Sequence, residues 1–129
     1  MATTTTSSES VIRCSHERIK SAKLTFAADV TGGTWDFLNN TVGLIPESVD
    51  VSEEDEGAFY YEIEDVLAPK KTGQTWTVLQ QLYFDSTLDN FTNVQNGGSQ
   101  NKKSGFSLEA AGTAATTGRM NLIGKQNQY

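Results

Sequence analysis

Short runs of alternating apolar and polar residues, most of them closed by a turn containing Gly or Pro, dominate the chain from residue 57 onward. The clearest run places three large apolar side chains on one strand face, namely Phe59, Tyr61 and Ile63. The opposite face carries Tyr60, Glu62 and Glu64. Because successive side chains of a strand point to opposite faces, this period of two predicts a strand with one buried face.

Turn signals divide the rest of the chain into further short segments. Asn39 and Asn40 separate two apolar runs, and Asn tolerates the left-handed backbone that a tight hairpin requires. The segments with strand character are residues 11–20, 23–28, 35–38, 41–45, 57–67, 81–84, 91–92, 106–110 and 119–123. Gly and Thr residues interrupt the helix formers of residues 109–115. The sequence therefore predicts an all-β fold, a small single-domain β-barrel or β-sandwich with hairpin connections.

Nine residues are expected to form the core because they fall on the inward faces of these strands. They are Trp35, Phe59, Tyr61, Ile63, Leu82, Phe84, Phe106, Leu108 and Leu122. Beside the last strands, Ser107 and Glu109 are expected to point outward, and residues 96–103 are expected to form an exposed loop. Residues 50–56 contain five acidic side chains among seven, and this density of like charge predicts a solvated loop.

The first ten residues, MATTTTSSES, differ in composition from the rest of the chain. They offer almost nothing to bury, so burial cannot offset the entropy of ordering them. We expect a flexible arm at residues 1–10 and a β-domain at residues 11–129. Thr has high β propensity, so such an arm can add along the edge of a partner's sheet. The candidate contact residues are Thr3, Thr4, Thr5, Thr6, Ser7 and Ser8.

Length and charge narrow the classes of function. The 129 residues suit one domain, and no run of eighteen apolar residues is present to span a membrane. The start of the chain lacks the basic and apolar regions of a signal peptide, so retention in the cytoplasm during synthesis is expected. The formal net charge of −6 argues against a nucleic-acid partner, because such proteins need clustered Lys and Arg.

Candidate chemistry is sparse. Cys14 and His16 would share one face of a strand, yet zinc needs four ligands, or three and a water, and no other Cys or His exists. The acidic residues 50–56 lack the spacing of a calcium-binding EF-hand loop. A single Cys forms no intrachain disulfide. We therefore expect no catalytic residues, no metal and no cofactor, which makes the protein a binding or structural protein rather than an enzyme.

Four segments follow one another in a recognisable order between residues 42 and 124. They are a strand ending in APK at residues 68–70, a strand end YFD at 83–85, an apolar strand at 105–111 and the closing segment GRMNL at 118–122. This order resembles the small head-decoration, or cement, proteins of tailed bacteriophages. In that family the second motif is of the type Tyr-Trp-Asp, and this chain has Phe in place of Trp.

The resemblance implies a compact β-barrel or β-sandwich on the outer capsid surface of the virion. Its partners would be the phage major capsid protein and further copies of itself, as a homotrimer or a dimer, and its function would be to cement neighbouring coat subunits of the expanded head. An alternative is a carbohydrate- or receptor-binding β-domain of a phage tail or fibre. A third interpretation, a small β-barrel hydrolase, requires a cleft with a perturbed acid or base. Exposed Trp35 or Trp76 would favour the carbohydrate-binding alternative, and buried tryptophans would favour the cement protein.

Overall fold

The computed structural model describes residues 12–95 and 101–125. These residues form strands and turns, and their only helical element is the short 3-10 turn η1 (His16–Arg18). The strands are β1 (Ile19–Thr25), β2 (Thr34–Leu38), β3 (Thr41–Ile45), β4 (Glu56–Pro69), β5 (Gln81–Asp85), β6 (Asn90–Thr92), β7 (Asn101–Ser107) and β8 (Thr117–Ile123). The predicted all-β fold is confirmed.

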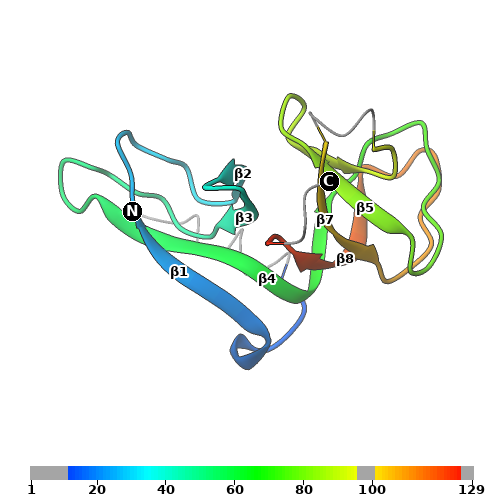
Figure 1. Cartoon of the computed structure of the whole chain (residues 1–129), viewed down its shortest axis with the longest axis horizontal. Helices are drawn as coiled ribbons and strands as arrows, with labels where there is room; N and C mark the ends of the chain where they lie inside the picture. Colours follow the sequence, from blue (N-terminus) through cyan, green and yellow to red (C-terminus); the bar gives the residue numbers. More distant parts are fainter. Residues whose placement is uncertain (1–11, 96–100, 126–129) are drawn as a thin grey trace.

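One sheet joins all eight of these strands in the order β2-β3-β4-β8-β7-β5-β6, and β1 pairs with the other edge of β4. The end of β4 returns to β6 through a bridge between Lys70 and Phe91. The Lys71 amide donates a hydrogen bond to the Phe91 carbonyl at 2.9 Å. The second half of β4 therefore closes a barrel with β5–β8, and its first half forms an open sheet with β1–β3 (Figure 1). We call these the barrel half and the sheet half.

The barrel half and the sheet half meet around a shared aromatic core. The Phe91 ring lies 5.1 Å from Trp35 of β2 and 5.1 Å from Phe84 of β5, measured between ring centroids. The core cluster comprises Trp35, Val42, Leu44, Ile63, Val66, Ala68, Trp76, Leu82, Phe84, Phe91, Met120 and Leu122. Burying one such large side chain contributes about 1.5–3 kcal/mol. Five of the nine predicted core residues belong to this cluster, and its largest fully buried member, Trp76, was not among the nine.

Strand β4 changes face along its length, which corrects the predicted alternation. Phe59 is buried outside the core cluster, and its ring lies under Gly43, while Tyr60 packs against the cluster. Ile63 does belong to the cluster. The register of β4 against β1 shifts between Lys20 and Ser21, so one extra residue of β4 inserts between Phe59 and Ile63. Phe59 and Ile63 therefore lie on different faces of the sheet, although their even spacing predicted the same face.

Strand β7 also departs from the predicted pattern. Ser107 is fully buried, Phe106 and Leu108 are only half-buried, and Ala110 is exposed. The register against β5 shifts between Leu82 and Tyr83, opposite Gly105, whose φ of 132° is open to Gly alone. This irregularity inverts the inward face of the strand. The predicted loop of residues 96–103 is likewise wrong at its end, because β7 begins at Asn101, and residues 96–100 lie outside the described part.

Two predictions near the start of the chain had opposite outcomes. Asn39 and Asn40 have φ values of 52° and 60° and close the β2–β3 hairpin, as predicted. Residues 11–20 do not form one strand, because η1 interrupts them before β1 begins at Ile19. Ile12 instead forms an isolated bridge to Val66 of β4.

Candidate docking surfaces

The residues that suggested metal or nucleophilic chemistry are not arranged for it. Cys14 is half-buried and packs against the core cluster, and its Sγ lies 4.0 Å from the Arg18 carbonyl oxygen. His16 lies on η1 and is exposed. Among residues 12–95 and 101–125, no group of three or more His, Cys, Asp or Glu side chains is placed to hold a metal ion. Within the same ranges, no helix has the length and apolar character needed to cross a membrane.

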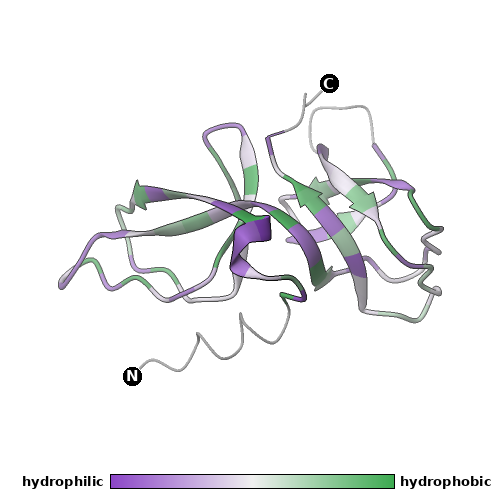
Figure 2. Ribbon diagram, turned by 90° about the horizontal axis from the view of Figure 1, so that it is seen from below, coloured by the Kyte–Doolittle hydropathy of each residue, from purple (hydrophilic) through white to green (hydrophobic). Residues whose placement is uncertain are grey.

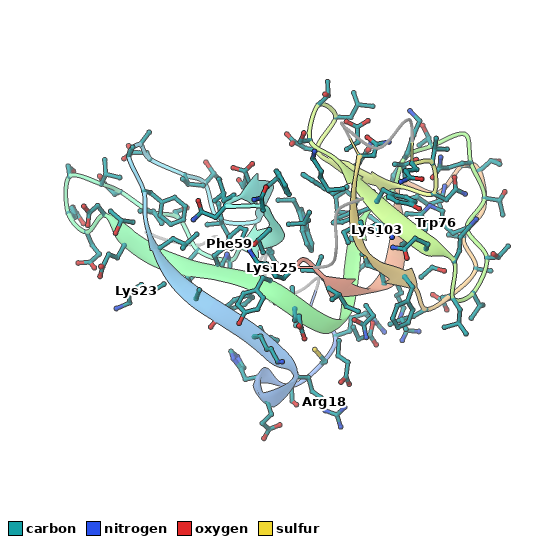
Figure 3. The ribbon with its side chains drawn as sticks, in the orientation of Figure 1. Arg18, Lys23, Phe59, Trp76, Lys103 and Lys125 are labelled. Atoms are coloured by element: carbon teal, nitrogen blue, oxygen red, sulfur yellow. The ribbon has the colours of Figure 1, made fainter. Side chains whose placement is uncertain are left out.

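Both tryptophans are buried, so neither offers an open platform for a sugar ring. Trp35 is 8% exposed and Trp76 is 0% exposed. The Trp76 indole N–H donates a hydrogen bond to Gln74 Oε1 at 3.1 Å, and its six-membered ring lies directly beneath Gly118. Figure 3 shows Trp76 in the barrel half. This observation disfavours the carbohydrate-binding alternative.

Lys70 is buried beside Trp76 and serves the fold. Only 3% of the residue is exposed, and the ammonium lies 5.9 Å from the Trp76 ring. It donates hydrogen bonds to the carbonyl oxygens of Lys71 and Gln74, which fixes the turn after β4. Burial lowers the pKa of Lys70 below 10.5, since desolvation disfavours the ammonium form.

An open apolar groove of about 240 Å³ crosses the sheet half. Its walls come from β1, β4 and the β2–β3 hairpin, and Figure 3 shows Phe59 and Lys125 beside one another in this region. The lining residues are Ala22, Leu24, Leu38, Asn39, Thr41, Phe59, Tyr61 and Lys125. Lys125 donates a hydrogen bond to the Asn39 carbonyl oxygen at 3.2 Å, which leaves mainly hydrocarbon in the groove.

A tight turn in the barrel half presents apolar side chains to solvent. The Gln80 amide donates to the Thr77 carbonyl oxygen at 3.2 Å, which closes a β-turn over residues 77–80. Leu79 occupies the third position with φ of 66° and is 69% exposed, and Val78 before it is 58% exposed. A left-handed conformation costs a residue with a Cβ about 1–2 kcal/mol. Gly or Asn would avoid that cost, so the geometry of the turn does not explain why position 79 is Leu.

The turn at residues 77–80 is held rigidly in spite of its strain. The Leu79 amide donates to the Ser107 carbonyl oxygen at 2.9 Å, and the Ser107 amide donates to the Gln80 carbonyl oxygen at 3.0 Å. The Ser107 hydroxyl is fully buried, donates to the Thr77 carbonyl oxygen and accepts from the Gln80 amide. These bonds explain why a Ser rather than an apolar residue faces inward here.

Charge is strongly segregated along the sequence, although in the sheet half Lys20 and Lys23 of β1 lie 3.8 Å from Glu62 and Glu56 of β4. Residues 24–69 contain eleven of the 16 acidic residues and no Lys or Arg. Residues 70–129 contain six Lys or Arg and three acidic residues. The loop before β4 is the acidic extreme, and Figure 2 shows hydrophilic residues at that tip of the sheet half. Fields of this kind guide association with a partner of opposite charge.

Within the acidic loop, Asp50 organises a local turn. Its Oδ1 accepts hydrogen bonds from the Ser52 hydroxyl at 2.7 Å and the Ser52 amide at 3.1 Å. These bonds stabilise the carboxylate and lower the pKa of Asp50 below 3.8. Residues 52–56 are exposed, so the loop is solvated as predicted.

The surface thus consists of an apolar groove, an apolar turn and separated charges, which are features of a docking protein. A family profile described as phage cement protein matches residues 16–122. The chain belongs to the phage cement protein family. No curated protein and no solved structure matches the chain. As a family member, this cement protein has a structural role in stabilising the phage capsid and is located in the virion capsid.

The sequence motifs of the cement protein lie in its structural framework. Ala68 and Lys70 of the first motif are buried, and Phe84 of the second is fully buried. The last motif begins with Gly118. A larger residue would clash there, because an added Cβ would lie 2.5 Å from the Trp76 ring. The buried residues of these motifs therefore serve the fold.

The predicted contact residues Thr3, Thr4, Thr5, Thr6, Ser7 and Ser8 lie outside the described residues. The groove and the Leu79 turn were not predicted. The groove depends on pairing between distant strands, which the sequence does not reveal. The turn at residues 77–80 contains no Gly or Asn from which it could be predicted. The charge segregation was visible in the sequence, since no Lys or Arg occurs between Lys23 and Lys70.

Proposed function

We propose that this cement protein binds the major capsid protein on the outer surface of the expanded phage head and bridges neighbouring coat subunits. The observation that carries the proposal is membership of the cement family over residues 16–122. One structural feature supports it, namely the burial of both tryptophans, which disfavours the carbohydrate-binding alternative. A head-stabilising protein needs surfaces for adhesion rather than an active site.

Adhesion at several points explains how small contacts can stabilise a shell. An oligomer that touches several coat subunits gains effective concentration for each contact after the first. We propose a homotrimer, which offers three equivalent sets of contacts. A protein that binds only the expanded shell also shifts the equilibrium toward that state, since binding stabilises whichever conformation it selects.

We also propose that residues Thr3–Ser8 form a capsid-contact arm. An extended Thr-rich segment can add to a sheet edge of the coat protein through main-chain hydrogen bonds, without needing specific pockets. Ile12 supports this arrangement because its bridge to Val66 ties the first described residue to the edge of β4. Deleting residues 2–10 should lower capsid occupancy and leave the melting temperature of the free protein unchanged. A Gly/Ser replacement of equal length is the matched control, which separates β propensity from reach.

The proposed function can be tested by sedimentation with purified heads. Wild-type protein is mixed with undecorated expanded heads and with unexpanded precursor heads, and the protein that sediments with each is measured. The proposal predicts saturable binding to expanded heads and little binding to precursors. Failure to sediment with either kind of head would refute it, and equal binding to both would refute selection of the expanded state.

A further inference from the structure

The turn at residues 77–80 combines a strained backbone with an exposed apolar tip. Leu79 has φ of 66° and is 69% exposed, and Val78 beside it is 58% exposed. The other non-glycine residues of the described ranges with positive φ are Asn39, Asn40 and Asp89, which are residue types that tolerate this conformation. Backbone strain that the surrounding structure enforces is concentrated at functional sites. The free protein gains nothing from Leu at position 79, so we infer that this side chain serves an external contact.

The segments that hold this turn fix the direction in which the tip projects. Besides the bonds to Ser107, the backbones of Trp76 and Ala111 exchange two hydrogen bonds, at 2.9 and 3.1 Å, directly before the turn. The Trp76 side chain is fully buried, which anchors the same segment in the core. Binding through a rigid turn costs little conformational entropy. The tip is therefore preorganised for contact.

The segments that form and support the tip carry almost no charge. Residues 72–84, which include the turn, contain no Asp, Glu, Lys or Arg. Residues 104–118, which supply Ser107 and Ala111, contain only Glu109. Charged residues make up 20% of the whole chain, so the depletion is local. Depletion of charge distinguishes the core of a protein–protein interface from ordinary surface, which favours a protein partner with an apolar recess.

The small size of the tip indicates which protein that partner is. A stable complex of two proteins buries about 800 Å² on each partner, and two aliphatic side chains supply only a small part of that area. The tip alone therefore cannot hold two free copies together. On a lattice of coat subunits it is one of several contacts of the same oligomer, and each later contact needs little area of its own. Resting on the proposed function, we propose that Leu79 and Val78 insert into an uncharged apolar recess of the major capsid protein.

Binding of matched variants to expanded heads tests this contact. Leu79→Asn removes the apolar side chain without endangering the fold, because Asn tolerates the left-handed conformation. Leu88→Asn makes the same change at a Leu that is 53% exposed on the β5–β6 turn, and Leu79→Met keeps an apolar side chain at the tip. The free concentration at half-saturation should rise at least about tenfold for Leu79→Asn and less than about threefold for the other two variants. The melting temperature of Leu79→Asn should not fall.

The binding results distinguish failure of this contact from failure of the proposed function. Wild-type protein that binds expanded heads no better than Leu79→Asn does would overturn the contact alone, as would an equal loss of binding in Leu88→Asn. Wild-type protein that binds no heads would overturn both proposals. Sedimentation equilibrium of the free proteins should show the same oligomeric state for wild type and Leu79→Asn. Weaker self-association of the variant would assign the tip to a second copy and overturn the contact with the coat.

Photochemical cross-linking identifies the partner directly. Leu79→Cys in a Cys14→Ser background is labelled with a benzophenone maleimide, bound to expanded heads and irradiated. The expected product joins one cement protein to one coat subunit and is several times more abundant than the product from Leu88→Cys. Equal yields from the two positions, or a product that joins two cement proteins instead, would contradict the proposal.

Discussion

Replacing Phe91 with Ala removes the ring on which the sheet half and the barrel half meet. Phe91 is fully buried, and its ring lies 5.1 Å from the rings of Trp35 and Phe84. A Phe→Ala change in a core costs about 3–5 kcal/mol, because it loses buried area and leaves a cavity. A domain of this size has a total stability of about 5–15 kcal/mol, so the loss is a large part of the total. The melting temperature should fall by roughly 10–20 °C.

Urea denaturation followed by tryptophan fluorescence measures the loss at Phe91, since Trp35 reports on the same contact. Leu88→Ala is the matched control, because Leu88 is 53% exposed and should change stability by less than about 0.5 kcal/mol. A double-mutant cycle of Trp35→Leu and Phe91→Leu should give a coupling of about 0.5–1.5 kcal/mol for the edge-on pair. A loss below about 1 kcal/mol for Phe91→Ala would refute the view that this ring joins the two halves.

Three further changes test other parts of the fold. Gly124→Ala should lower the free energy of unfolding, measured by urea denaturation, by about 3 kcal/mol, because the new Cβ would lie 1.7 Å from the Val42 carbonyl oxygen. Gly112→Ala is the control and should be neutral, because a Cβ at Gly112 would have nothing within 4 Å. Ser107→Ala should cost about 1–3 kcal/mol, because it removes the hydroxyl that bonds the Thr77 carbonyl oxygen and the Gln80 amide. A larger loss for the half-buried Leu108→Ala would contradict the facing of β7. Burial lowers the pKa of Lys70, so just below pH 10.5 the unfolded protein binds more protons than the folded protein. The free energy of unfolding should therefore rise with pH in this range. The rise should be smaller in Lys70→Met.

Local turn chemistry was the part of the fold that the sequence predicted well. Asn39 and Asn40 adopt left-handed conformations that few residue types tolerate, so these two residues were enough to predict the hairpin. Strand β5 begins at Gln81 and the β5–β6 turn follows, both as expected. In these segments the signal lies within a few neighbouring residues, so sequence alone is sufficient.

The errors arose where a distant strand decides the conformation. The inward face of β7 depends on the irregularity at Gly105, which exists only because β5 and β8 approach the strand from both sides. Phe59 changed face for the same reason, through the shifted register with β1. Leu79 has a left-handed backbone because Ser107 holds the turn, although no turn residue marks it. Pairing between distant segments is not recorded in local alternation, so these features required the structure.

The most direct measurement of the central claim is the heat stability of expanded heads with and without this cement protein. Undecorated heads are heated alone, with wild-type protein, and with Phe91→Ala protein that is unfolded at the test temperature. DNA release is followed with a fluorescent dye. If the protein stabilises the capsid, wild-type protein should raise the temperature of release, and the unfolded variant should not. Identical release temperatures with and without the folded protein would contradict the claim.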